Sequence, residues 1–222
     1  FSMTQDDINA IAARVISIEA DALHQMAGDL PADFAGAVEA ILQTKGRVIV
    51  SGVGKSGHIG NKIAATLAST GTPASFVHAT EASHGDLGMV TAADFCLLIS
   101  NSGETSELRD IVAHTRRFGI PMAAISSKPH STLMQAADFK LALPAAPEAC
   151  SIGMAPTTST TLTLALGDAL AVALMERRDF QPEDFKVFHP GGKLGAQMVT
   201  VAQLMHRGGA LPIVDHTTSM QD

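Results

Sequence analysis

The chain has 222 residues, of which 46% are hydrophobic, and a formal net charge of −7. This length supports one sizeable hydrophobic core, and the lack of an apolar run near 18 residues argues against a membrane span. The negative charge, with no basic stripe along any predicted helix, argues against a nucleic-acid surface. The two cysteines, Cys96 and Cys150, fit a reducing cytoplasm better than a disulfide scaffold.

Two helices are predicted before the first strand. In the first helix, Thr4 and Asp7 have the spacing of a capping box, and the second helix ends at Gly46. Apolar residues at helical spacing form one face of each helix: Ile8, Ile11, Val15, Ile18, Ala22 and Met26 in the first, and Phe34, Val38, Ile41 and Leu42 in the second. No signal peptide precedes them, and residues 1–3 look like a vector remnant followed by the start of the protein.

Strands and helices then alternate along the chain. Strands are predicted at 47–51, 73–77, 94–100, 121–126 and 138–143, and helices near 58–70, 106–118 and 130–137. Alternation with short connections implies right-handed crossovers between parallel strands. The sequence therefore predicts an α/β fold with a doubly wound, five-stranded parallel sheet that follows the N-terminal helices.

The first strand runs into a glycine-rich turn, Ser51-Gly-Val-Gly-Lys-Ser-Gly57. A strand that breaks into such a turn before a helix directs free backbone N–H groups, and the positive end of the helix dipole, at one point in space. That point favours an anion, and the hydroxyls and the lysine of this turn favour a phosphate ester. The predicted contacts are Ser51, Gly52, Gly54, Lys55 and Ser56.

Two nucleotide motifs compete for this turn. A P-loop requires a glycine five positions before Gly54, where the strand residue Ile49 stands, so the P-loop is excluded. The glycines at 52, 54 and 57 do satisfy the dinucleotide fingerprint, which also requires an acidic residue at the end of the second strand. That strand ends in His78, and the first carboxylate after it is Glu81. NAD binding is therefore the weaker alternative.

A second loop of the same kind follows the third strand. Ser100, Ser102 and Thr105 surround Gly103 just before a helix that Gly119 closes, and three hydroxyls can surround the oxygens of a phosphate. A serine-capped helix is the ordinary explanation for one such loop. Two such loops at the carboxyl ends of strands, where open parallel sheets bind ligands, favour a phosphosugar site instead.

A long helix is predicted from Thr157 to Arg177. Thr157, Thr158 and Ser159 at its start are predicted both to cap the helix and to bind substrate. Its apolar, alanine-rich surface is wider than the stripe that one sheet requires. We therefore expect part of it to pack against another subunit in a symmetric homo-oligomer, a tetramer built as a dimer of dimers.

Five segments of the chain together resemble one family. They are Ser51-Gly-Val-Gly-Lys-Ser-Gly-His58, Glu81-Ala-Ser-His-Gly-Asp-Leu-Gly-Met89, Ser100-Asn-Ser-Gly-Glu-Thr-Ser-Glu107, Ala155-Pro-Thr-Thr-Ser-Thr-Thr161 and His189-Pro-Gly-Gly-Lys-Leu-Gly195. In this order they resemble the sugar isomerase (SIS) domain of arabinose 5-phosphate isomerases over about residues 4–206, with the domain itself at 4–200. The resemblance implies a flavodoxin-like SIS domain that interconverts D-ribulose 5-phosphate and D-arabinose 5-phosphate through an enediol. That reaction is the first step towards Kdo for lipopolysaccharide, and the resemblance implies no required cofactor.

The resemblance also implies roles for four side chains. A lysine, two glutamates and a histidine of the family correspond to Lys55, Glu107, Glu148 and His189. Either Glu148 or His189 would abstract the carbon proton and the other would serve the oxygens or open the ring, and that choice stays open. Lys55 would neutralise either the charge that develops during the reaction or the phosphate, and Glu107 would orient Lys55 or bind a hydroxyl. The lysine and both glutamates also have ordinary explanations as surface or helix-terminal charges.

Further contacts are implied around the second strand. The resemblance supports substrate contact at His84, Gly71 and Thr72. The spacing of His78, Glu81 and His84 matches no closed structural zinc site. If zinc binds, His78 is the predicted ligand, and the ion would inhibit the reaction rather than assist it.

The tail, residues 201–222, looks like a linker and the opening of a truncated cystathionine-β-synthase (CBS) pair. Two other functions remain as alternatives to the isomerase. One is a non-enzymatic sugar-phosphate sensor, although such regulators usually carry an N-terminal helix-turn-helix domain. The other is an SIS isomerase of a different phosphosugar, such as a hexulose phosphate or sedoheptulose 7-phosphate, because fold analogy does not settle substrate.

Overall fold

The computed structural model describes residues 4–189, 205–206, 208 and 211. The chain divides into two units, Phe1–Phe180 and Gln181–Asp222, and each is described by itself. The predicted vector remnant at 1–3, the predicted boundary at 200 and nearly all of the predicted CBS opening at 201–222 lie outside the described residues.

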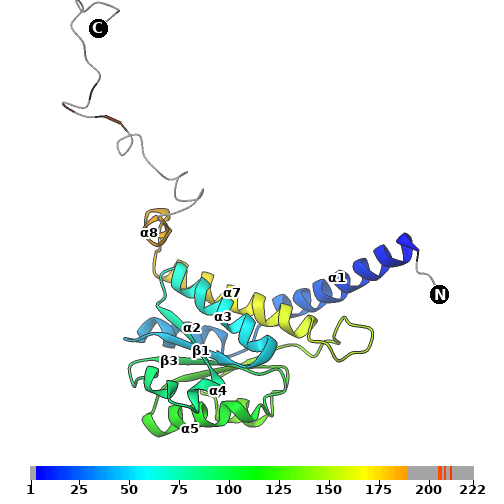
Figure 1. The fold of residues 1–222 in the computed structure, drawn as a ribbon, viewed down its shortest axis with the longest axis horizontal. Coiled ribbons are helices and arrows are strands. Elements are labelled where there is room, and N and C mark those ends of the chain that lie inside the picture. The colour runs from blue at the N-terminus through cyan, green and yellow to red at the C-terminus, as the bar shows by residue number, and fades with distance from the viewer. Residues whose placement is uncertain (1–3, 190–204, 207, 209–210, 212–222) are drawn as a thin grey trace, which may run out of the picture. The chain divides into compact units, whose positions relative to one another are not determined.

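The first unit is built on a five-stranded parallel sheet, which confirms the predicted fold class (Figure 1). The strands are β1 (Val48–Gly52), β2 (Ala74–His78), β3 (Phe95–Ile99), β4 (Met122–Ser126) and β5 (Phe139–Ala142). Their spatial order is β2-β1-β3-β4-β5, and every neighbouring pair is parallel. The chain therefore leaves β1 towards one edge and returns beside it as β3, so the crossover direction reverses between these two strands. In open α/β sheets, ligands bind at the carboxyl ends of the strands at such a reversal.

Helices cover both faces of this sheet. The main ones are α1 (Gln5–Gly28), α2 (Phe34–Gln43), α3 (Gly54–Ser69), α5 (Arg109–Phe118), α6 (Thr132–Ala136) and α7 (Thr158–Arg177). The residues after β2 and β3 form the short α4 (Ala79–Ala82), η1 (Asp86–Met89) and η2 (Ser106–Leu108). Figure 1 shows α1, α2, α3 and α7 on one side of the strands and α4 and α5 on the other. The second unit contains α8 (Pro182–Phe188).

The central strands are apolar on both faces. Along β1, Val48 and Val50 belong to the core under α3 and α7, whereas Ile49 belongs to the core on the opposite side. Every residue of β1, β3 and β4 is buried. Continuous burial of this kind is expected where a parallel sheet is covered by helices on both sides.

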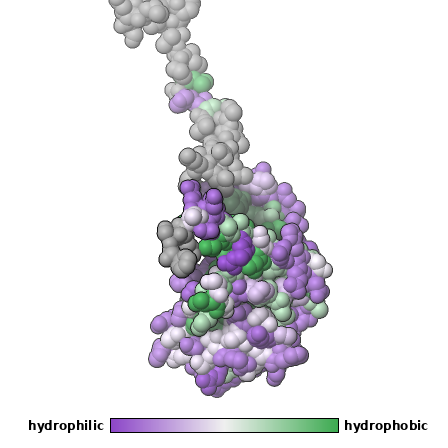
Figure 2. Space-filling view, turned by 90° about the vertical axis from the view of Figure 1, so that its right-hand side faces the viewer, coloured by the Kyte–Doolittle hydropathy of each residue, from purple (hydrophilic) through white to green (hydrophobic). Residues whose placement is uncertain are grey.

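The N-terminal helix α1 is capped as predicted, but only its second half enters the core. The Thr4 hydroxyl accepts the Asp7 N–H at 3.2 Å and the Asp7 carboxylate accepts the Thr4 N–H at 2.9 Å. Ala22 and Met26 are buried, whereas Ile8 is 56% exposed. In Figure 1 the first half of α1 extends beyond the sheet that the second half covers, and Figure 2 shows hydrophobic residues gathered between hydrophilic ones on that side of the molecule.

Helices α3 and α7 pack very closely against each other. A Cβ atom added at Gly167 would lie 2.4 Å from the Ile63 side chain, so only glycine allows this approach. An ion pair between Lys62 and Asp168 joins the same two helices. The α7 helix has the length and hydropathy of a membrane span, but half of that window is buried and it packs against α1, α2 and α3. Its hydropathy is therefore that of a core helix.

Candidate active site

The corner between β1 and α3 presents backbone donors at the carboxyl edge of the sheet. Helix α3 begins at Gly54, four residues earlier than the predicted start at 58, so Lys55 and Ser56 lie in its first turn and not in a loop. The helix has no side-chain N-cap at Val53, which leaves its first N–H groups to a ligand or to solvent. Gly54 has φ +55°, a conformation that favours glycine.

The loop after β3 is organised by its own hydroxyl groups. Ser100 Oγ lies 2.7 Å from Thr105 Oγ1 and accepts the Gly103 N–H at 3.0 Å. Ser102 Oγ accepts the Glu104 N–H at 3.2 Å. These bonds hold the three predicted hydroxyls within one turn of backbone before η2, so the loop is stabilised by its own side chains.

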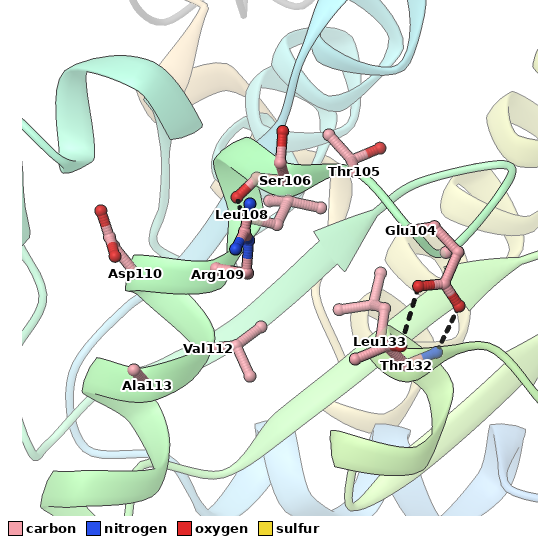
Figure 3. Close-up of a pocket in the computed structure, with 11 residues that line it drawn as sticks. Glu104, Thr105, Ser106, Leu108, Arg109, Asp110, Val112, Ala113, Thr132 and Leu133 are labelled. Carbon is pink, nitrogen blue, oxygen red and sulfur yellow. Dashed lines mark hydrogen bonds between the residues drawn. The ribbon is translucent and has the colours of Figure 1, made fainter.

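Glu104 fixes the same loop to α6. Its carboxylate oxygens accept the Thr132 N–H at 2.7 Å and the Thr132 hydroxyl at 2.8 Å, as the dashed lines in Figure 3 show. These two bonds lower the pKa of Glu104, which keeps the side chain ionised. The loop that carries Ser100, Ser102 and Thr105 is therefore held at both ends.

A cavity of about 340 Å³ lies where these two loops meet the start of α7. It brings together six predicted residues from three segments that are distant in sequence, and among the described residues that line it Lys55 is the one cation. Two helix N-termini, those of α3 and α7, contribute lining residues, which adds to the preference for an anion. The predicted members are Lys55, Ser56, Ser100, Ser102, Thr105 and Ser159.

Three polar residues of the lining were not singled out in the sequence. Asn101 stands between two predicted serines, and Thr160 and Thr163 are on the α7 surface that carries Ser159. The signal for the threonines was present, because positions 159, 160 and 163 share one face of a helix that begins at Thr158. Thr163 Oγ1 donates to the Ser159 carbonyl at 2.8 Å, so its hydroxyl is already used within the helix.

Glu148 lies beside the start of α7. Its Oε2 atom accepts the Thr157 N–H at 2.7 Å, the Thr157 hydroxyl at 3.1 Å and the Ser159 N–H at 3.3 Å. Burial raises the pKa of Glu148, but the donors of Ser159 and Thr157 lower it by more, so the net shift is downward. Glu148 is thus an ionised carboxylate that caps the helix lining one wall of the cavity.

Glu107 lies in η2, directly after the serine-rich loop. Glu107 is exposed, its backbone N–H and the Ser106 hydroxyl lower its pKa, and Arg109 and His78 contribute smaller effects of the same sign. Glu107, predicted to orient Lys55 or to bind a hydroxyl, forms no ion pair with Lys55 within residues 4–189, and both roles stay predictions. No group of three or more His, Cys, Asp or Glu side chains that could hold a metal occurs in the described part of the chain, so zinc at His78 remains a prediction without a coordination shell.

Other predicted residues lie apart from the cavity lining. Ser51 and Thr158 are fully buried, and neither hydroxyl has a hydrogen-bond partner among the described residues. His84 is exposed in the segment after α4. Gly71 and Thr72 precede β2, which places them at the amino edge of the sheet, opposite the cavity. There Gly71 packs against the Phe180 ring and the Thr72 hydroxyl accepts a hydrogen bond from Arg178, and their predicted substrate contact stays a prediction.

His189 belongs to the second unit, directly after α8. Its Nδ1 lies 2.9 Å from the Phe185 carbonyl oxygen, and its ring stacks on the Phe185 ring with centroids 3.8 Å apart. Donation from Nδ1 to the carbonyl leaves Nε2 as the basic nitrogen. A role for His189 in the cavity stays a prediction.

A second cavity, about 630 Å³, lies between α5 and α6. Figure 3 shows its apolar floor, with Leu108, Val112 and Leu133, and the polar side chains around it. Thr105 lines both cavities, so the serine-rich loop separates them.

The geometry agrees with the comparison of this chain with known families, in which the SIS domain matches residues 41–173. The chain belongs to the SIS-domain family. It is 49% identical over 217 residues to arabinose 5-phosphate isomerase KdsD of Yersinia pestis, covering 97% of this chain and 66% of that protein. The KdsD of Pseudomonas aeruginosa is 50% identical over 210 residues, which is 94% of this chain and 64% of that protein. The chain thus spans slightly less than two thirds of these curated relatives.

A solved structure matches this chain over the whole length of the solved protein. The E. coli CFT073 protein c3406, in complex with arabinose 5-phosphate, is 39% identical and superimposes with a TM-score of 0.82, covering 85% of this chain and 100% of that chain. This likeness supports the assignment of the fold to the SIS family.

Proposed function

We propose that this SIS domain is an aldose–ketose isomerase that interconverts D-ribulose 5-phosphate and D-arabinose 5-phosphate through an enediol, the first step towards Kdo for lipopolysaccharide. The observation that carries the proposal is the cavity of about 340 Å³ in which hydroxyls, one ammonium group and two helix N-termini converge. The names of the curated relatives and the arabinose 5-phosphate bound to c3406 support the choice of substrate.

The phosphate of the substrate would occupy the end of the cavity between α3 and the serine-rich loop. Ser56, Ser102 and Thr105 would donate hydroxyl hydrogen bonds to its oxygens, and the first N–H groups of α3 would add backbone donors. Lys55 would supply the positive charge. Because the loop hydroxyls already hold one another, little ordering would be needed when the phosphate binds.

The sugar carbons would then extend towards the start of α7. Isomerisation removes a proton from the carbon next to the carbonyl and returns it to the neighbouring carbon, while a second proton moves between the two oxygens. Glu148 is ionised, which is the form that a base requires. His189, through Nε2, would serve the oxygens, and Lys55 would stabilise the enediolate. Glu107 would bind a hydroxyl or act on Lys55, and no cofactor is required by this chemistry.

Assembly and location are part of the same proposal. The first half of α1 exposes Ile8, Ile11 and Ile16, and the loop before α7 exposes Ile152 and Met154. Exposed apolar side chains of this kind support a homo-oligomer, proposed to be a tetramer built as a dimer of dimers. A cytoplasmic location is proposed because both cysteines, Cys96 and Cys150, are free thiols.

The direct test is an assay of the purified protein with ribulose 5-phosphate. The expected product is arabinose 5-phosphate, and the competing aldopentose phosphates and a hexulose phosphate are assayed in parallel to test specificity. Turnover of another phosphosugar alone would replace the proposed substrate. Tight binding of the sugar phosphates without turnover of any of them would replace the isomerase by a sensor.

The mechanism has its own test in heavy water. An enediol route predicts that solvent deuterium enters the carbon next to the carbonyl during turnover, because the abstracted proton waits on a group that water can reach. Full activity after exhaustive chelation is expected alongside. Retention of the original label, combined with a strict need for a divalent metal, would instead indicate a hydride shift.

A further inference from the structure

The hydrogen bonds of the Glu148 carboxylate are distributed unevenly. All three donors, the N–H groups of Thr157 and Ser159 and the hydroxyl of Thr157, converge on Oε2. Within residues 4–189, no donor makes a hydrogen bond to Oε1, although the Ser159 hydroxyl, which is buried without a partner, lies near enough to the carboxylate to lower its pKa. A carboxylate oxygen has about two lone-pair sites, so Oε2 is fully used, whereas Oε1 can take a proton without losing a hydrogen bond from the described residues.

The Thr157 hydroxyl determines this arrangement. Thr157 Oγ1 accepts the Ala149 N–H at 2.9 Å and donates to Glu148 Oε2 at 3.1 Å. Because a backbone N–H can only donate, the acceptor role of Oγ1 towards Ala149 is fixed, and the hydroxyl hydrogen is left to point at the carboxylate. Ala149 is fully buried and its carbonyl accepts a hydrogen bond from Arg14 of α1 at 3.4 Å, so the neighbour of Glu148 is itself held in place.

We propose that Thr157 is a positioning residue that orients the Glu148 carboxylate through Oε2 and so makes Oε1 the oxygen that takes the carbon proton. The inference rests on the proposed isomerase function for its catalytic part. In the step, the bond between the carbon and its hydrogen breaks and a bond between that hydrogen and Oε1 forms. The electron pair left behind forms the carbon–carbon double bond of the enediolate, and the carbonyl oxygen becomes negatively charged beside Lys55. The same Oε1 later returns the proton to the neighbouring carbon.

This assignment separates Thr157 from the residues that bind substrate. The hydroxyls of Ser56, Ser102 and Thr105 belong to residues that line the cavity, whereas Thr157 is not part of that lining. Both hydrogen-bonding functions of its hydroxyl are engaged with groups nine or fewer positions away in the chain. Thr157 would therefore affect proton transfer rather than affinity.

The test compares Thr157→Val with Thr157→Ser. Valine keeps the branched shape and the backbone N–H but removes the hydroxyl, and serine restores it. We expect Thr157→Val to lower kcat by roughly ten- to thirtyfold while KM changes by less than about threefold, and Thr157→Ser to recover most of the loss. The acidic limb of the kcat–pH profile should move to higher pH in the valine variant, because the ionised carboxylate has lost a donor. The matched control is Thr66→Val, which removes the hydroxyl of a half-buried residue of α3 that donates to the Lys62 carbonyl, and it should leave both constants unchanged.

A second measurement does not depend on turnover. Carbon-13 NMR titration of the Glu148 carboxyl group in the free protein should give a higher pKa in Thr157→Val than in wild type, with Thr157→Ser close to wild type. A rise in KM with an unchanged kcat would overturn the proposal, since it would make Thr157 a substrate contact. An unchanged Glu148 titration in a folded valine variant would overturn it as well. If wild type shows no isomerase activity but the titration shifts as expected, the proposed reaction fails and the positioning of Glu148 by Thr157 stands.

Discussion

Two carboxylates, Asp94 and Glu148, lie at opposite edges of the sheet. Both accept hydrogen bonds from the same kinds of donor, but the bonds are arranged differently. At the amino edge, Asp94 Oδ1 accepts the Arg47 N–H at 2.7 Å, and Oδ2 accepts the N–H and the hydroxyl of Thr91 at 2.7 and 2.9 Å. At the carboxyl edge, Glu148 also accepts two N–H groups and one threonine hydroxyl, but all of them reach one oxygen. A carboxylate bonded through both oxygens holds two segments together, whereas one bonded through a single oxygen keeps the other for chemistry.

Asp94 is also more deeply buried than Glu148. Asp94 is 3% exposed, and a Cβ atom at Gly46 would lie 2.2 Å from its Oδ1, so no other molecule can approach it. Glu148 is half-buried, beside the helix start that lines the cavity. Asp94 is therefore expected to matter for stability and Glu148 for turnover.

The largest expected effect is on turnover, in Glu148→Gln. The amide keeps the size of the side chain and an oxygen for Thr157, but it is not a base at neutral pH. We expect kcat to fall by roughly 10²-fold or more with nearly unchanged affinity for inorganic phosphate, because a base acts in the transition state. Steady-state kinetics and phosphate-binding calorimetry measure the two quantities. A variant that retains full turnover would return the role of base to His189.

The next effect is on stability, in Asp94→Asn. The amide NH₂ must face either the Arg47 N–H or the two Thr91 donors, so at least one part-buried donor loses its acceptor. We expect the free energy of unfolding to fall by about 2 kcal/mol, measured by urea unfolding. Turnover per folded molecule should stay within about twofold of wild type. A large loss of turnover with unchanged stability would contradict the assignment of Asp94 to stability and of Glu148 to turnover.

Acid should reduce the difference in the free energy of unfolding between wild type and Asp94→Asn. Burial raises the pKa of Asp94, but the hydrogen bonds from Arg47 and Thr91 lower it by more, so the net shift is downward. A lowered folded-state pKa stabilises the fold above the unfolded value of about 4, and that stability is lost as the pH falls through the folded pKa. Urea unfolding at a series of pH values below 5 should therefore show wild type losing stability faster than the variant. Asp138, whose pKa is lowered chiefly by its hydrogen bonds from Arg116, contributes equally to both proteins.

The smallest effect is expected in the cavity wall, in Ser102→Ala. Its hydroxyl is one of several on the loop, and it also accepts the Glu104 N–H. We expect KM for the sugar phosphate to rise by roughly three- to tenfold with little change in kcat, since a contact made equally in the ground and transition states affects binding alone. The same change at Ser69, whose hydroxyl donates to the Thr66 carbonyl far from the cavity, provides a control. A fall in kcat without a change in KM would move Ser102 from binding to catalysis.

The sequence predicted the sheet well because its signals are local. Five apolar runs at the right spacing correspond to the five strands, and the capping box at Thr4 formed as expected. The start of α3 at Gly54 was not predicted, and neither was the short helix α4. Glycine and small polar residues carry no helical periodicity, so the helix at Gly54 begins inside what looked like a loop. The exposed first half of α1 shows the opposite limit, since an amphipathic pattern does not reveal which part of a helix the core covers.

The site was predictable where residues follow a strand directly. Ser56, Ser102 and Thr105 reach the cavity because the carboxyl ends of β1 and β3 are adjacent, which follows from the strand order. Glu148 was placed by resemblance alone, since the donors that hold it come from residues nine to eleven positions later. Gly71 and Thr72, which the resemblance alone suggested, precede β2, and their substrate contact stays a prediction. Thr160 was not singled out, although the predicted helix from Thr157 already placed it beside Ser159.

The close contact at Gly167 joins α3 and α7, the two helices whose first turns contribute lining residues to the cavity. Ile63 and Gly167 meet roughly two helical turns beyond Lys55 on α3 and Ser159 on α7. We therefore expect the distance between α3 and α7 at this crossing to set the width of the cavity. That width separates Lys55 from the start of α7, where the Glu148 carboxylate is bound. A methyl group at position 167 would push the two helices apart, so we expect the width of the cavity to depend on a residue outside its lining.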